Sequence, residues 1–163
     1  MRWPEYNQLN TYYGNPDKNR DGSPDVNWEI ENIVRFKPPM PMIWSWSKQP
    51  VSKIAIHKKC ESSLYRILEK MNKLSPDVIE KHKLYECGGA YNFRLMRGGN
   101  KLSTHSWGCA IDIAPEINVL GRKYDPRSNM IPSRVIDIFE DEGWQWGGLW
   151  GRPDGMHFQA CKQ

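Results

Sequence analysis

Two histidines and two aspartates in the second half of the chain are spaced so that they could form a catalytic metal site. His105 precedes a short apolar stretch that contains Asp112, and Asp154 stands three positions before His157. A histidine on the loop that leads into a strand and an aspartate within that strand can converge on one point. Two imidazoles and one carboxylate leave a fourth position for water, which is a ligand set of catalytic Zn²⁺. Zinc lowers the pKa of its bound water to about 7, and Asp154 would take the proton as the water attacks.

The residues around Asp112 predict that its carboxylate is buried in a strand over residues 110–114. Alternation along that strand places Ala110 and Ala114 on the face of Asp112, and two isoleucines on the other face. An unpaired buried carboxylate is costly, and a metal ion would supply its partner. The pattern alone leaves a simpler interpretation open, because a histidine on a strand is more often a structural residue. The helical zinc motif H-E-x-x-H, which would have settled the choice, is absent.

The same residues carry a resemblance to a known family. They spell S-x-H-x-x-G-x-A-x-D, followed by D-x-x-H, at Ser103, His105, Gly108, Ala110, Asp112, Asp154 and His157. This pattern resembles the M15 family of zinc peptidases, which includes D-alanyl-D-alanine carboxypeptidases, dipeptidases, and phage endolysins that cut between L-alanine and D-glutamate in peptidoglycan stems. The run W-G-G-x-W at 146–150 and the final M-H-F resemble the phage-type branch. The resemblance covers residues 87–159.

The resemblance implies a role for each matched residue at the metal. His105, Asp112 and His157 match the ligands of one zinc ion. Asp154 matches the catalytic carboxylate, which is glutamate in many relatives. The aspartate side chain is one methylene shorter, so the reach of this base to the zinc-bound water is the weakest point of the match.

Residues that would bind the substrate are also implied by the resemblance. Arg94 matches an arginine that steadies the developing oxyanion or a substrate carboxylate, and Arg97 is a nearby competitor for that role. Ser103 matches the motif serine, a hydrogen-bond donor to the substrate or to the ligands. Four tryptophans could form a sugar-stacking wall beside the zinc, although packing in the core or cleft is the favoured interpretation. They are Trp107, Trp144, Trp146 and Trp150.

The elements that must position these residues predict an α+β domain. Apolar alternation, helical periodicity and the Gly/Pro punctuation indicate a small antiparallel sheet flanked by helices, and the resemblance implies the fold of hedgehog and D-Ala-D-Ala peptidase domains. We expect strands over residues 33–36, 42–46, 51–56, 90–95, 110–114, 143–146 and 156–161. We expect helices over residues 58–71, 76–82 and 133–142.

The first 50 residues differ in composition from the rest. They hold too many prolines for long helices and too many aromatic side chains for a free tail. We therefore expect residues 1–50 to be an irregular arm packed on the body, and residues 51–163 to be the zinc peptidase domain.

One segment of this arm reads like the start of a calcium loop. It has oxygen-bearing side chains at the first, third, fifth and ninth positions, namely Asp17, Asn19, Asp21 and Asp25. The twelfth position, where calcium loops carry glutamate, is Trp28. A polar turn is therefore the favoured interpretation, and Ca²⁺ binding is the alternative.

Composition predicts one packed domain and restricts the partners. The 163 residues include 8 Trp, 7 Tyr and 4 Phe, and the four cysteines, which show no C-x-x-C spacing, are expected to be free and buried. The net charge of +4 argues against nucleic acid but is compatible with an anionic cell wall. No stretch approaches the roughly 18 apolar residues of a membrane span. We expect His57 and His82 to lie at the surface or to flank helices.

Charge is unevenly distributed along the chain. Residues 48–73 have an excess of Lys and Arg, whereas residues 125–157 have an excess of Asp and Glu. This asymmetry favours a basic docking side and an acidic functional side, and two solvated faces explain it about as well.

These observations lead to one expected function and two alternatives. We expect a monomeric zinc peptidase that cuts bacterial peptidoglycan as a phage endolysin. The start of the sequence lacks the apolar core of a secretory signal, so the expected location is the host cytoplasm, with release to the wall through a holin. A D-alanyl-D-alanine carboxypeptidase is the first alternative. A non-catalytic zinc-containing module that binds the cell wall is the second.

Overall fold

The sheet that carries the candidate ligands is built from strands that lie far apart in the sequence. The computed structural model describes residues 2–163. The order of the five strands is β2 (Ile43–Trp44), β4 (Glu86–Gly89), β5 (Ala110–Ile113), β7 (Asp154–Gln159) and β6 (Gln145–Gly147). Neighbouring strands are antiparallel, except that β2 runs parallel to β4. The predicted α+β class is confirmed, with one short parallel edge strand in the sheet.

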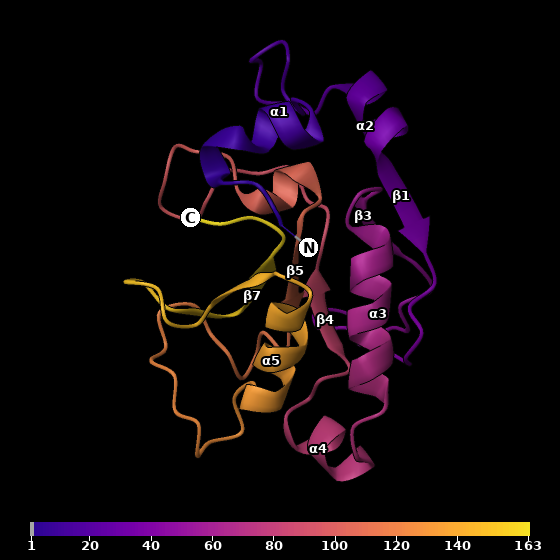
Figure 1. The fold of residues 1–163 in the computed structure, drawn as a ribbon, viewed down its shortest axis with the longest axis vertical. Helices are drawn as coiled ribbons and strands as arrows, with labels where there is room; N and C mark the ends of the chain where they lie inside the picture. Colours follow the sequence, from indigo (N-terminus) through magenta and orange to yellow (C-terminus); the bar gives the residue numbers. More distant parts are fainter. Residues whose placement is uncertain (1) are drawn as a thin grey trace.

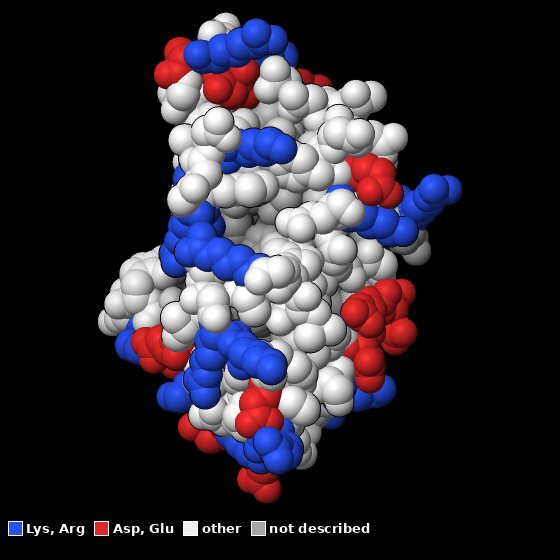
Figure 2. Space-filling model, turned by 90° about the vertical axis from the view of Figure 1, so that its left-hand side faces the viewer, with Lys and Arg blue, Asp and Glu red and all other residues white. Residues whose placement is uncertain are grey.

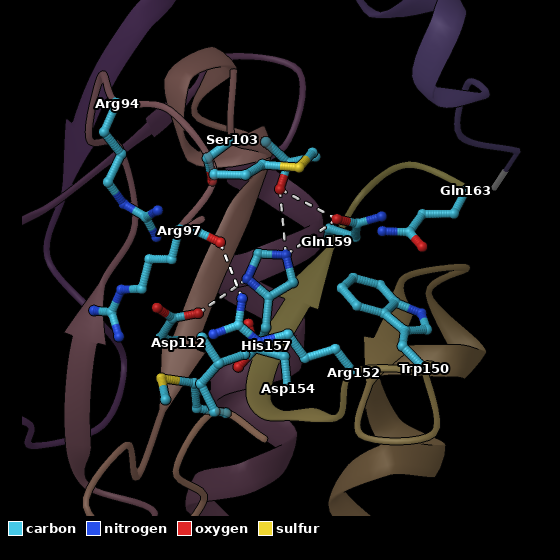
Figure 3. A pocket seen from close by; sticks show the side chains of 14 residues that line it. Arg94, Arg97, Ser103, Asp112, Trp150, Arg152, Asp154, His157, Gln159 and Gln163 are labelled. Carbon is cyan, nitrogen blue, oxygen red and sulfur yellow. Dashed lines mark hydrogen bonds and ion pairs between the residues drawn. The ribbon is translucent and has the colours of Figure 1, made fainter. Parts of the chain in front are cut away.

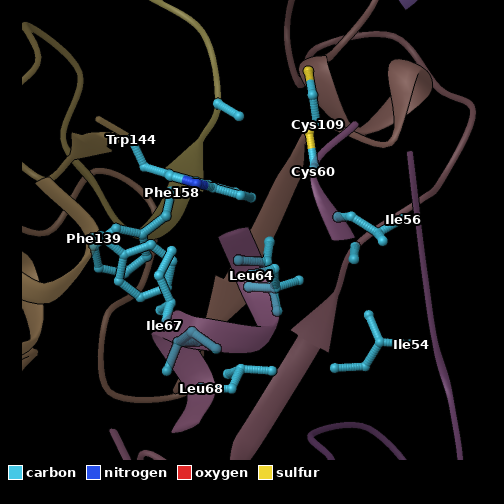
Figure 4. Packing of buried hydrophobic residues seen from close by; sticks show 14 of the residues in the cluster. Ile54, Ile56, Cys60, Leu64, Ile67, Leu68, Cys109, Phe139, Trp144 and Phe158 are labelled. Atoms are coloured by element: carbon cyan, nitrogen blue, oxygen red, sulfur yellow. The ribbon is translucent and has the colours of Figure 1, made fainter. Parts of the chain in front are cut away.

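Two helices pack against one face of this sheet. In Figure 1, α5 (Ser133–Asp141) lies in front of the central strands, and α3 (Glu61–Asn72) runs to the right of β4. Phe139 of α5 stacks on Phe158 of β7, with ring centroids 3.8 Å apart (Figure 4). The apolar residues of both helices, at the spacing that predicted them, are buried in the same cluster. This face of the sheet is therefore the core of the protein.

The pleat of the two central strands points their polar side chains away from the face of the sheet that forms the core. β5 and β7 pair so that Ile111 lies opposite Phe158 and Asp112 lies opposite His157. Successive side chains of a strand point to opposite faces. Because Phe158 faces α5, Asp112 and His157 project together from the face opposite that helix. The register of one strand pair thus brings two of the predicted ligands side by side.

The other predicted helix of the body is present as well. α4 (Pro76–Lys81) begins after Ser75, whose hydroxyl accepts a hydrogen bond from the backbone N–H of Val78 at 3.4 Å. Ser75 thus caps the helix, and Pro76 occupies its first turn, where a proline needs no backbone donor. None of the helices in residues 2–163 is long and apolar enough to cross a membrane.

The arm contains more regular structure than its prolines indicated. Besides β2, its elements are η1 (Tyr6–Gln8), α1 (Leu9–Tyr13), α2 (Val26–Asn32) and the predicted strand β1 (Ile33–Phe36). β1 pairs antiparallel with β3 (Ile54–His57) in a separate two-stranded sheet. Each helix has at most 7 residues and so fits between prolines without a long periodic pattern.

Aromatic side chains join this arm to the end of the chain. Trp3 Nε1 donates a hydrogen bond to the carbonyl of Glu142 at 2.9 Å, and the hydroxyl of Tyr13 donates to the carbonyl of Ala160 at 2.7 Å. Trp3 and Tyr13 are buried in the same cluster as the helices of the body. The arm therefore supplies part of the core that it covers.

One predicted strand is in the wrong place. The sequence favoured residues 90–95, because Gly88 and Gly89 look like a break, but the strand is β4 at residues 86–89. A Cβ on Gly88 would lie 2.9 Å from the Cβ of Asp112, so glycine is required where the two strands pass closely. Beyond the strand, the backbone N–H groups of Tyr91 and Asn92 bond to other segments and do not continue the ladder.

The surface position expected for His57 and His82 is wrong, but His82 does flank a helix, because it is the C-cap of α4. Both are buried, at 0% and 7% exposure. His57 Nε2 lies 3.1 Å from the carbonyl of Tyr13, and His82 Nδ1 lies 2.6 Å from the carbonyl of Met130. A neutral imidazole donates one hydrogen bond, so a backbone carbonyl is enough to keep it inside. The four cysteines are free and buried, as predicted.

Two basic side chains of residues 48–73 form ion pairs at the surface. Lys48 pairs with Glu86 and Glu116, at 3.3 and 2.7 Å, and Arg66 pairs with Glu142 at 2.7 Å. These contacts join separate segments of the chain. Figure 2 shows another group of Lys and Arg side chains, in a band down one face of the molecule beside a hollow.

Candidate active site

Three side chains from separate segments meet on the face of the sheet opposite α5. His105 Nε2 lies 3.2 Å from Asp112 Oδ1 and 3.2 Å from His157 Nδ1. His157 Nδ1 lies 3.0 Å from the same carboxylate oxygen. The three residues are almost fully buried. The structure therefore brings together the ligands that the sequence predicted.

A single turn of 3-10 helix, η2 (Thr104–Trp107), holds the first histidine. The hydroxyl of Ser103 accepts a hydrogen bond from the backbone N–H of His105 at 3.3 Å and caps this helix. Gly108 ends the helix with a φ of 64°, and a Cβ there would lie 2.8 Å from the backbone nitrogen of His57. The three fixed positions of S-x-H-x-x-G therefore correspond to the serine that caps the helix, the histidine ligand, and a glycine in the left-handed conformation that ends the helix. Ser103 also lines the pocket described below.

In each histidine, the outer ring nitrogen, which points away from the triangle, lies beside a hydrogen-bond acceptor. His105 Nδ1 lies 2.5 Å from the carbonyl of Ala90, and His157 Nε2 lies 3.0 Å from Gln159 Oε1. An N–H on each outer nitrogen donates to that oxygen and leaves a lone pair on the inner nitrogen. The two inner nitrogens and the carboxylate oxygen then point lone pairs at one another.

The electrostatics of the triangle favour a positive charge at its centre. Burial alone would raise the pKa of Asp112, but His105 and His157 together hold it well below its usual range. Burial would lower the pKa of His157, but the hydrogen bond to Asp112 and the negative charge of that residue raise it. Both shifts arise from the attraction between the Asp112 carboxylate and a positive charge beside it, which a metal ion would also supply.

The donor set fits a zinc ion. Tetrahedral bonds of about 2.0 Å to zinc separate neighbouring ligand atoms by about 3.3 Å. The observed edges of 3.0 to 3.2 Å are close to that separation. In the part of the chain that the structure describes, residues 2–163, this is the group of His, Cys, Asp or Glu side chains that could hold a metal ion.

The predicted base lies beside the triangle at the start of β7. Figure 3 shows Asp154 next to His157 in the same pocket. Burial raises the pKa of Asp154, and the charge of Asp112 raises it further, against the opposing effects of His157, His105 and Arg97. Its Oδ1 atom is buried without a hydrogen-bond partner among the described residues. A buried carboxylate of this kind binds a proton readily, which suits a general base.

Arginines surround the pocket that opens beside this group. Arg94, Arg97 and Arg152 line a cavity of about 190 Å³ together with Asp154 and His157. Arg152 Nη1 donates to the carbonyl of Arg97 at 3.0 Å, and Arg94 also donates to a backbone carbonyl. Such contacts leave the positive charges without a carboxylate partner among residues 2–163. The pocket is therefore suited to a substrate that carries carboxylates.

The four tryptophans of the tail divide between core and pocket. Trp107, Trp144 and Trp146 are buried to 6% exposure or less, which confirms the packing interpretation for these three. Trp150 is half-buried, lines the pocket, and has its ring centroid 5.6 Å from that of His157. In Figure 3 it stands on the opposite side of His157 from Arg94 and Arg97.

Three positioning residues could not be found from the sequence pattern. Gln159 accepts from His157, and the hydroxyl of Thr104 donates to the same Gln159 oxygen at 3.1 Å. Ser106 fixes the backbone of Arg94, because its hydroxyl donates to the Arg94 carbonyl at 2.8 Å and accepts from the Arg94 N–H at 3.0 Å. The only hint was period-two spacing, which puts Gln159 and His157 on the same face of β7.

The segment read as a possible calcium loop forms a polar turn. The carboxylate of Asp21 accepts from the hydroxyl and the N–H of Ser23, at 2.7 and 2.9 Å. Asp25 caps α2 by accepting from the N–H of Trp28 at 2.8 Å. Asp17 accepts from the N–H of Asp21 at 3.2 Å, so three of the four oxygen-bearing side chains are engaged in local hydrogen bonds, as the favoured interpretation expected.

Comparison with known proteins identifies the class. A family model described as Peptidase_M15_4, D-alanyl-D-alanine carboxypeptidase, matches residues 97–160. This segment contains η2, the three candidate ligands and Asp154, and it is similar to the M15 peptidase family. At the level of the family, the match supports a peptidase that acts on peptidoglycan. Searches of curated proteins and of solved structures gave no match.

Proposed function

We propose that this protein is a zinc-dependent peptidase that hydrolyses peptidoglycan stem peptides. The observation that carries the proposal is the triangle of His105, Asp112 and His157, with the unpartnered carboxylate of Asp154 beside it. A structural site would have closed the fourth position with a protein ligand, whereas this one opens to a pocket lined with arginines. The family match to residues 97–160 supports the same reaction class.

The residues of the chain divide the work of peptide hydrolysis. A bound zinc ion would polarise the scissile carbonyl and acidify a water molecule. Asp154 accepts the proton of that water and later gives it to the leaving amine, because burial raises the affinity of its carboxylate for a proton. Arg94, fixed by Ser106, provides positive charge near the developing oxyanion.

The shape of the cleft favours cleavage within a stem peptide. A second pocket, of about 340 Å³, also reaches Asp112 and shares Arg94 and Arg97 with the first. The ligands therefore lie where two lobes join. A substrate that continues on both sides of the cut bond fits this arrangement, so we propose an endopeptidase of the L-alanyl-D-glutamate type.

A D-alanyl-D-alanine carboxypeptidase is the second candidate. The description of the matching family favours it, and so do the arginines, since one of them could bind a terminal carboxylate. Digestion of purified peptidoglycan with zinc supplied, followed by mass analysis of the fragments, separates the two. New amino-terminal D-glutamate supports the endopeptidase, whereas release of free D-alanine alone would reject it.

The role of Asp154 separates an enzyme from a non-catalytic binding module. Asp154→Asn keeps the shape of the side chain but removes its basicity, so we expect kcat to fall by about 10²- to 10⁴-fold. Zinc content measured by atomic absorption should not change, because Asp154 is outside the ligand triangle. Asp141→Asn, at the exposed end of α5, is the matched control. Unchanged hydrolysis in Asp154→Asn would exclude this residue as the base.

A further inference from the structure

Two tryptophans of the arm form an exposed stacked pair at the edge of the sheet. Trp44 and Trp46 have ring centroids 4.9 Å apart and planes inclined by 21°. Trp44 is half-buried, but Trp46 is 66% exposed, which is unusual for so large an apolar ring. Both lie outside the segment that matches the peptidase family.

The turn that carries Trp46 is fixed by hydrogen bonds. The N–H of Trp44 donates to the carbonyl of Gln49, and the N–H of Lys48 donates to the carbonyl of Trp44, both at 2.9 Å. The ammonium group of Lys48 pairs with Glu86 and Glu116. The exposure of Trp46 is therefore built into the fold, and a ligand that binds this ring would pay little entropy to order it.

This pair lines the second pocket of the cleft. The residues that line this pocket of about 340 Å³ include Trp44 and Trp46 as well as His105 and Asp112. Gly89 lies between them, and a Cβ there would already touch the ring of Trp46 at 4.0 Å. A molecule whose bond is cut at the metal centre can thus extend over the indole pair without leaving the cleft.

We propose that Trp46 and Trp44 bind a sugar ring of the glycan strand to which the stem peptide is attached. This inference rests on the proposed function, since a stem peptide joined to glycan supplies a sugar next to the cut bond. The C–H face of a pyranose packs on an indole face, while its hydroxyls need polar groups at the rim. Asn92, which lines the same pocket, is such a group. The stem peptide itself offers small and charged side chains, which gain little from an indole.

The test compares two substrates that differ only in the sugar. One is a muropeptide with its disaccharide, and the other is the same stem peptide with an acetylated amino terminus. We expect Trp46→Ala to lower kcat/KM for the muropeptide about tenfold, the size of a lost aromatic contact, and to change it less than about twofold for the free peptide. Tyr65→Ala, which removes an exposed ring from α3, should affect neither. An equal effect on both substrates would overturn the sugar assignment and indicate that the peptide occupies this lobe.

A binding measurement keeps this inference distinct from the proposed function. Peptide-free glycan of the disaccharide repeat is titrated into the wild-type protein and into Trp46→Ala, with tryptophan fluorescence as the readout. Saturable quenching in the wild type that is weakened about tenfold in the variant supports the subsite, even if neither peptide substrate is cut. Equal quenching in both proteins, or none in the wild type, would refute it. Hydrolysis of the free peptide by the wild type reports separately on the peptidase.

Discussion

At the scale of single residues, the site depends on which nitrogen of each histidine is free. Ala90 and Gln159 accept from the outer nitrogens, so His105 presents Nε2 and His157 presents Nδ1 to the same point. The choice differs between the two because one histidine approaches from a 3-10 helix and the other from a strand. Groups behind the ligands therefore determine the metal site as much as the ligands themselves.

Gln159 provides a test at this scale. Gln159→Leu removes the acceptor for His157 and also the partner of Thr104, and we expect zinc affinity to fall by about 10- to 100-fold. Competition with a chromophoric chelator measures that affinity. Gln163→Leu, which changes an exposed glutamine at the rim of the same pocket, is the matched control and should bind zinc as the wild type does. Equal affinities in the two variants would show that Gln159 has no part in orienting the ligand.

At the scale of elements, β3 and the arm are held together by a buried neutral histidine. Burial lowers the pKa of His57 to about 4. Its Nε2 donates to the carbonyl of Tyr13, and its Nδ1 accepts from the N–H of Lys59 at 3.1 Å. Both nitrogens are thus engaged in the neutral form, and protonation would break the second bond.

This arrangement predicts a pH dependence of stability. Below the ordinary pKa of histidine the unfolded chain binds a proton at His57 that the folded chain resists, so the free energy of unfolding falls as the pH drops from about 6.5 toward 4. We expect about 2 kcal/mol over that window. Urea denaturation of the zinc-free protein at several pH values measures it. In His57→Gln the step should be absent although the variant is less stable at pH 7; parallel curves for the two proteins would contradict this role.

At the scale of the whole molecule, the first and last segments of the chain share one core. Tyr13 reaches Ala160, and Trp107 of η2 donates to Asn10 Oδ1 at 3.0 Å. The arm therefore supports the turn that carries His105 from outside the sheet. We infer that the residues ahead of the peptidase motif stabilise the site as well as extending its cleft.

A pair of tyrosines tests this long-range support. Tyr13→Phe removes a buried hydroxyl and leaves the carbonyl of Ala160 without its donor, which should lower the free energy of unfolding by about 1 to 2 kcal/mol. Tyr12→Phe is the control, because its ring over Lys59 is kept. Thermal denaturation followed by circular dichroism gives both values. A loss of the same size in the two variants would argue against a specific role for the Tyr13 hydroxyl.

The local sequence determined the parts of this protein that depend on short spacing. Helix periodicity predicted α3 and α5, and the motif from Ser103 to Asp112 predicted a ligand and a buried carboxylate within ten positions of each other. Features that require distant segments of the chain to meet were decided only by the tertiary structure. It placed β4 at its two glycines because Asp112 passes there, buried His57 against Tyr13, and set Trp46 at the mouth of the cleft. Spacing along the chain fixes which side chains share a helix turn or a strand face, whereas contacts between separate segments arise only when burial of apolar surface packs them together.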